Sequence, residues 1–71
     1  MELMCFVVKR SGEPVDISRL RRDRRKAWEL YLNESDPDEN RFQRMIWKAS
    51  DMDGVRLHCY RLVPSGTSDT L

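Results

Sequence analysis

Apolar positions at both ends of the chain follow a strand period. Residues 3–10 are apolar on both alternating faces, which predicts a strand that is covered on both sides. Gly12 is expected at a tight turn, and Pro14 limits the predicted return strand, residues 14–17, to a short edge position. Residues 55–63 also alternate, which predicts a closing strand. The predicted inward side chains of the closing strand are Val55, Leu57, Cys59 and Val63.

Helical spacing predicts two helices between these strands. Ser18 is expected to cap the first helix, which ends at Asn33 and Glu34. The apolar stripe of this helix is Ile17, Leu20, Ala27, Trp28, Tyr31 and Leu32. The second helix is expected to start with Asp36 as its cap and to stop at Gly54. Its inward face is Phe42, Met45, Ile46 and Ala49.

These elements predict one small α+β domain over residues 1–63. The predicted order is ββααβ, with a three-stranded sheet and two helices packed on one face of it. The last strand is expected to pair with the first, because that pairing closes a core that local contacts alone do not close. Residues 64–71 are polar and predict a flexible C-terminal tail.

Chain length and composition narrow the classes of protein. The 71 residues suffice for one domain, with 39% hydrophobic and 35% charged residues. The longest apolar run, Leu3 to Val8, is far shorter than the ~20 residues that cross a bilayer. Glu2 precedes that run and no small-residue cleavage site follows it, so the expectation is a cytoplasmic protein without a membrane partner.

Candidate catalytic and metal-binding groups are few. The chain has two cysteines and one histidine, too few for a zinc site. His58 and Cys59 are neighbours, so on a strand their side chains face opposite ways and form no nucleophile–base pair. Whether Cys5 and His58 share a face stays open. The expectation is a protein that is not an enzyme, with reduced cysteines and with no catalytic residue, metal, cofactor or small-molecule substrate.

Arginine is concentrated in residues 19–26, RLRRDRRK. Two functions suit such a cationic helix: contact with a partner protein, or contact with nucleic-acid phosphates. The net charge of +1 is low for a nucleic-acid-binding domain, which favours the protein partner. The alternative, a nucleic-acid-binding regulator, would use Arg19, Arg21, Arg22, Arg25 and Lys26.

Trp47 lies off the apolar stripe of the second helix, which predicts an exposed side chain; the alternative is that it covers a loop or packs between the two helices. Exposed tryptophan and tyrosine side chains often anchor protein interfaces. The expected partner-binding residues are Trp47, Arg22, Arg25, Lys26 and Tyr60. A homodimer that buries an open sheet face, lined by Met4, Phe6, Val8, Tyr60 or Leu62, is a further expectation.

The ordering of these segments resembles that of the small accessory proteins of bacteriophages and prophages. The resemblance rests on the opening strand MCFVVKR, a turn containing glycine, the segment SRLRRDRRKAW and the closing strand VRLHCYRLV. It implies a protein of the host cytoplasm that binds a larger protein and regulates or inhibits it. The leading expectation is therefore a non-enzymatic protein-interaction module.

Overall fold

The computed structural model describes residues 3–62. Within that range the chain forms strand β1 (Leu3–Arg10), the 3-10 helix η1 (Ile17–Arg19), helices α1 (Arg24–Leu32) and α2 (Glu39–Asp53), and strand β2 (Val55–Leu62). The described order is therefore β-α-α-β, and the class is α+β. Val63 and the predicted tail, residues 64–71, lie outside the described range.

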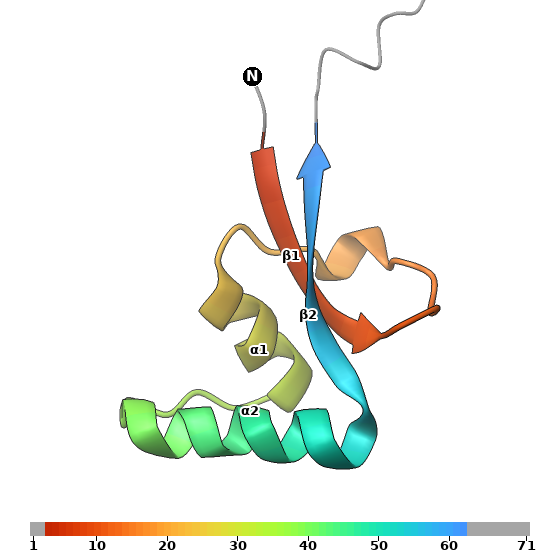
Figure 1. The fold of residues 1–71 in the computed structure, drawn as a ribbon. Coiled ribbons are helices and arrows are strands. Elements are labelled where there is room, and N and C mark those ends of the chain that lie inside the picture. The colour runs from red at the N-terminus through yellow and green to blue at the C-terminus, as the bar shows by residue number, and fades with distance from the viewer. Residues whose placement is uncertain (1–2, 63–71) are drawn as a thin grey trace, which may run out of the picture.

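The sheet joins the two ends of the described chain (Figure 1). β1 and β2 pair antiparallel over their full length, from Leu3 opposite Leu62 to Arg10 opposite Val55. The expected pairing of the first and last strands is confirmed. The expected third strand is wrong, because the sheet in residues 3–62 has two strands only.

Residues 14–17, predicted as the return strand, form no strand. Pro14 has no N–H to donate, and the Asp16 carboxylate accepts from the Ser18 N–H and so turns the chain into η1. The place beside β1 is taken instead by Arg21. Its N–H donates to the Phe6 carbonyl at 2.8 Å, and the Phe6 N–H donates to the Arg21 carbonyl at 2.7 Å.

This pairing also explains why α1 begins later than the sequence predicts. Arg21 has to be extended to bond Phe6, so a helix that starts at Ser18 is excluded and that prediction is wrong. Asp23 is the cap instead, and its carboxylate accepts from the N–H groups of Arg25 and Lys26. The predicted end of the helix is confirmed, because Asn33 is the C-cap in the left-handed conformation.

α2 also begins later than predicted. The N-cap is Asp38, whose carboxylate accepts from the Asn40 and Arg41 N–H groups, and not Asp36. Asp36 accepts from the Asp38 N–H and forms an ion pair with Arg41 at 2.9 Å. The predicted stop is confirmed at Gly54, whose φ of 69° lies in the left-handed region that glycine adopts easily.

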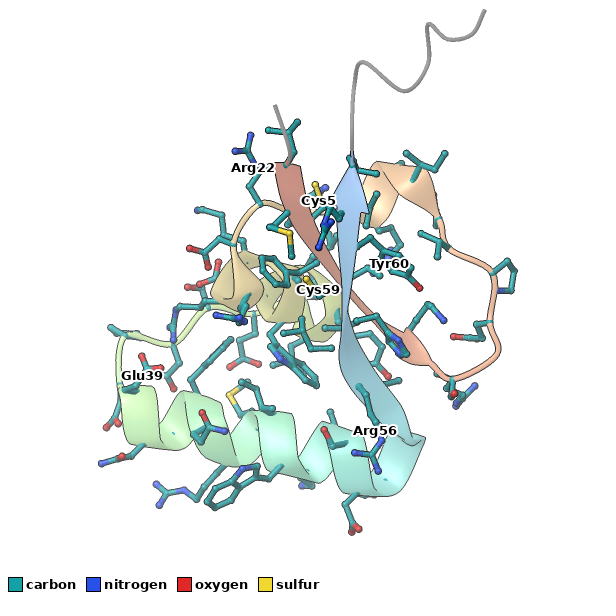
Figure 2. The ribbon with its side chains drawn as sticks, turned by 45° about the horizontal axis from the view of Figure 1, so that its top comes forward. Cys5, Arg22, Glu39, Arg56, Cys59 and Tyr60 are labelled. Atoms are coloured by element: carbon teal, nitrogen blue, oxygen red, sulfur yellow. The ribbon has the colours of Figure 1, made fainter. Side chains whose placement is uncertain are left out.

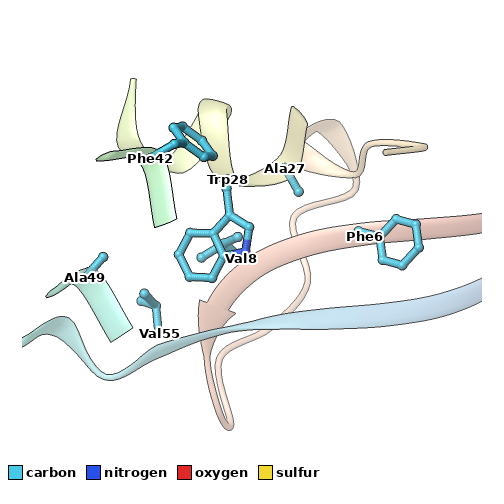
Figure 3. Close-up of a cluster of buried hydrophobic side chains, with 7 residues drawn as sticks. All are labelled: Phe6, Val8, Ala27, Trp28, Phe42, Ala49 and Val55. Carbon is cyan, nitrogen blue, oxygen red and sulfur yellow. The ribbon is translucent and has the colours of Figure 1, made fainter. Parts of the chain in front are cut away.

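The main core lies between the helices and one face of the sheet (Figure 3). Both predicted helix stripes contribute to it, with Phe42 the most buried large side chain. The core consists of Phe6, Val8, Ala27, Trp28, Phe42, Ala49 and Val55. Ile17 and Leu20 are exceptions to the predicted stripe: both lie before α1 and outside the core, and Ile17 is 78% exposed.

β1 is covered on both faces, as its sequence predicts. Phe6 and Val8 face the helices, and Cys5 and Val7, on the other face, are equally buried. In Figure 1 the segment with η1 lies on the side of the sheet opposite α1. The chain between β1 and α1 therefore wraps around β1, covering first one face and then, at Arg21, one edge.

Candidate functional site

The residues predicted to bind a partner do not form one surface. Trp47 is 65% exposed, as predicted, on the outer side of α2. Tyr60 lies on the sheet face that points away from the helices, because it alternates with Leu57 and Cys59 on β2. Arg22 precedes α1, and Figure 2 shows it well apart from Tyr60. The thickness of the fold thus separates the two aromatic side chains.

Arg25 has a structural role. Its guanidinium lies 4.0 Å from the centre of the Phe42 ring and forms ion pairs with Glu29 at 3.1 Å and Glu39 at 2.9 Å. It also donates to the Asp36 carbonyl. These contacts join α1, the following loop and the start of α2. Arg25 therefore holds the helices together and is poorly available to a partner.

The arginine-rich helix predicted for nucleic-acid binding is not formed as such. Arg19 belongs to η1, Arg21 pairs with β1, and Arg22 lies in a bend before the helix. The Arg21 guanidinium donates to the carbonyls of Ser18 and Leu20. Of the predicted set only Arg25 and Lys26 lie on α1. The cations therefore do not line one helical face.

Cys5 and Cys59 are both free, and the register explains why. Cys59 lies opposite Phe6 and Cys5 opposite Tyr60, so the two thiols are on opposite faces of the sheet. Cys5 and His58 do share the far face, as diagonal neighbours. Cys5 is only 6% exposed, however, and among the described residues the buried Nε2 of His58 has no hydrogen-bond partner. This pair is not arranged as an accessible nucleophile and base.

The two outer edges of the sheet differ. On β1, the Phe6 backbone is bonded to Arg21, and the Arg10 backbone is bonded to Glu13: the Arg10 N–H donates to the Glu13 carboxylate at 2.9 Å, and the Glu13 N–H donates to the Arg10 carbonyl at 3.2 Å. The edge of β1 is thus covered near its middle and at its end. This is a usual protection of edge strands.

β2 has no such cover within residues 3–62, where β1 is its one strand partner. Because Phe6 bonds outward to Arg21, its partner Cys59 forms a non-hydrogen-bonded pair with it. The N–H and C=O groups of Cys59, and by alternation those of Leu57, point away from β1. We call this row the open edge of β2. In Figure 1 it lies at the front of the sheet.

A hollow with both apolar and charged walls adjoins the open edge on its helix side. It lies between the first turns of α1 and α2 and the β2 strand. Its walls are Arg24, Arg25, Trp28, Glu39, Phe42, Gln43, Ile46 and Leu57. Trp47 follows Gln43 by one helical turn but lies on the outer side of α2, outside this hollow. We call the open edge together with this hollow the edge groove.

Tyr31, on α1, lies away from the open edge of β2. Its hydroxyl donates to the Asp53 carboxylate at 2.7 Å, which raises the pKa of Tyr31 because the neutral phenol keeps this bond. The bond ties the end of α1 to the end of α2. This group is therefore part of the framework and lies outside the edge groove.

Comparison of the chain with protein-family models, curated proteins and solved structures finds no match. Within the described range, no helix is long and apolar enough to cross a membrane. In the same range no group of three or more histidine, cysteine or acidic side chains could hold a metal ion. Within residues 3–62 the edge groove combines outward backbone groups of β2 with a hollow beside them.

Proposed function

We propose that this protein is a non-enzymatic, cytoplasmic interaction module that binds an extended segment of a larger protein along the edge groove. The observation that carries the proposal is the open edge of β2, whose outward N–H and C=O groups pair with no strand in residues 3–62. Main-chain groups of this kind pair readily with an added strand, and adjacent pockets supply the side-chain specificity. A reducing compartment would keep the exposed thiol of Cys59 reduced.

The contrast between the two edges supports this function. The chain uses residues 11–21 to cover one face and the edge of β1, but β2 keeps a regular register without a bulge or a proline. A long regular edge invites pairing unless something blocks it. Binding there would let a small accessory protein of the phage type regulate or inhibit the protein that supplies the segment.

Trp47 is assigned a contact outside the edge groove. Its indole is exposed on the outer side of α2, where it can contact a part of the larger protein beyond the bound segment. Exposed aromatic side chains are frequent interface anchors. Lys26 is assigned no contact in this proposal, and Arg25 contributes only as a wall of the hollow.

A matched pair of variants tests the proposal. Cys59→Pro removes one outward N–H but no bond to β1, whereas Cys59→Ala keeps the N–H and removes only the exposed thiol. A random peptide library would be selected against the protein, and the enriched peptides measured against both variants. We expect peptides that bind the wild type and Cys59→Ala equally, and Cys59→Pro at least about tenfold more weakly.

The same peptides provide a control that needs no variant. Methylation of alternate peptide nitrogens along one edge removes the donors that would pair with β2, and we expect it to abolish binding. Failure to enrich any peptide would overturn the proposal. Peptides that bind Cys59→Pro as tightly as the wild type would do the same.

A further inference from the structure

The two strands of the sheet carry a one-sided charge. Residues 3–10 and 55–62 contain Lys9, Arg10, Arg56 and Arg61, and no aspartate or glutamate. The whole chain has nearly balanced charge, at +1, so the absence of carboxylates from both strands is a property of this sheet and not of the composition. The strands themselves therefore present cations and no carboxylate to an added strand.

Lys9 and Arg56 are a pair of like charges on neighbouring strands. They are directly opposite each other in the register, so their side chains share the face away from the helices. Like charges in that position repel. The Lys9 ammonium donates to the Arg10 carbonyl at 3.2 Å, and no carboxylate of residues 3–62 forms an ion pair with the exposed Arg56. The Arg56 guanidinium is left facing a cation.

The next residue along β2, Leu57, favours an apolar side chain on the added strand. Leu57 points to the helix side, is partly buried against the core and lines the hollow together with Ile46. A side chain on an added strand, placed opposite Leu57, would enter that hollow. The neighbouring residue of the same strand would lie opposite Arg56, on the other face, because side chains alternate.

We propose that the segment bound by the edge groove is acidic and alternating: it presents a carboxylate opposite Arg56 and an apolar side chain opposite Leu57. This inference rests on the function proposed above and names the chemistry of the partner. The carboxylate would sit within reach of the Arg56 guanidinium and would relieve its repulsion with Lys9. The apolar side chain would fill the hollow beside Ile46.

A second copy of this chain is a poorer occupant. Pairing β2 with another β2 would bring together the arginines of both strands, Arg56 and Arg61 from each copy, and would add no carboxylate from either strand. The same charges that oppose self-pairing favour an acidic segment. Light scattering on the free protein at micromolar concentration is expected to report a monomer.

Synthetic peptides as long as β2, with blocked ends, provide the test. One alternates glutamate with valine, and its control alternates lysine with valine. We expect the acidic peptide to bind the wild type and the basic peptide to bind at least about tenfold more weakly. Arg56→Glu is expected to reverse this order. Arg44→Glu makes the same charge change on the exposed face of α2 and should leave the order unchanged.

The outcomes separate this inference from the proposed function. Equal affinity for the acidic and basic peptides, with loss of both in Cys59→Pro, would refute the acidic partner and keep the open edge. An acidic preference that Arg56→Glu does not change would also refute the role given to Arg56. Binding that is insensitive to Cys59→Pro would refute both proposals, and a β2-mediated dimer would refute the choice of occupant.

Discussion

Phe6 and Arg21 exchange two backbone hydrogen bonds, at 2.7 and 2.8 Å, although the segment around Arg21 reads as a helix. This pairing has three consequences. It delays the start of α1 to Arg24, and it covers the edge of β1. It also sets the direction of the β2 backbone groups, because Phe6 bonds away from its partner Cys59.

The Phe6–Arg21 pairing can be tested by two substitutions at one position. Arg21→Pro removes the N–H that donates to the Phe6 carbonyl, while Arg21→Ala keeps it and removes only the guanidinium. We expect Arg21→Pro to lower the free energy of unfolding by about 1–3 kcal/mol more than Arg21→Ala does. Urea denaturation of both variants measures this difference. Equal loss in the two variants would show that the backbone pairing contributes little.

Substitutions of Arg25 and Arg22 are expected to change the stability of the protein by different amounts, although both residues are cations of one segment. Arg25→Ala loses the contact with Phe42 and the ion pairs with Glu29 and Glu39, so we expect a loss of about 1–2 kcal/mol. Arg22 is exposed, and Arg22→Ala should change the free energy of unfolding by less than about 0.5 kcal/mol. Thermal and urea denaturation provide both values. A reversed order would contradict the packing of α1 on α2.

Asp36 makes the stability depend on acid pH. The Arg41 guanidinium and the Asp38 N–H hold the pKa of Asp36 below its ordinary value of 3.8. The folded state therefore binds this proton less readily than the unfolded state. The contribution of Asp36 is complete above pH 3.8 and is lost as the pH falls through the lower pKa of the folded protein.

Asp36→Asn should accordingly be less stable than the wild type at neutral pH and should lose less stability on acidification. Asp51→Asn is the control, since Asp51 is an exposed residue of α2 that forms no ion pair among residues 3–62. Urea midpoints measured from neutral pH down to about pH 2 compare the three proteins. If the urea midpoints of Asp36→Asn and the wild type fell equally steeply as the pH is lowered, this role would be refuted.

The two thiols should react at very different rates. Cys59 is exposed, whereas Cys5 is buried on the face of β1 that points away from the helices. With a chromogenic thiol reagent we expect one fast equivalent in the native protein and the second only on denaturation. Cys59→Ala should remove the fast phase. Two fast equivalents, or an intramolecular disulfide formed under mild oxidation, would contradict the register that puts these residues on opposite faces.

The terminal strands and the body of α2 are predictable from local pattern. The period of Phe42, Met45, Ile46 and Ala49 gives the buried face of α2, and Gly54 gives its end. The doubly apolar β1 signals burial on both sides. In these segments propensity, periodicity and tertiary packing favour the same structure, so a local argument suffices.

The region from Ser18 to Asp23 is where local pattern fails. Its residues suit a helix, but Arg21 gains two backbone hydrogen bonds to a strand that is distant in sequence. Such a long-range pairing leaves no periodic signal. Asp23, whose side chain suits an N-cap, starts the helix in place of the predicted Ser18. The tertiary contact decides between them.

The candidate site was predictable only in part. Exposure of Trp47 follows from its position off the α2 stripe, and the structure confirms it. The open edge of β2 was hidden by the third strand predicted over residues 14–17, because strand order is not encoded in alternation. The opposition of Lys9 and Arg56 likewise required the register.

Amide hydrogen exchange along β2 tests the central claim most directly. In the free protein the Cys59 and Leu57 amides should exchange fast and the His58 amide slowly, since only the last points to β1. Addition of the peptide that alternates glutamate and valine should then protect Cys59 and Leu57 at least about tenfold. Slow exchange of Cys59 and Leu57 before addition, or no added protection at saturation, would contradict strand addition at the open edge.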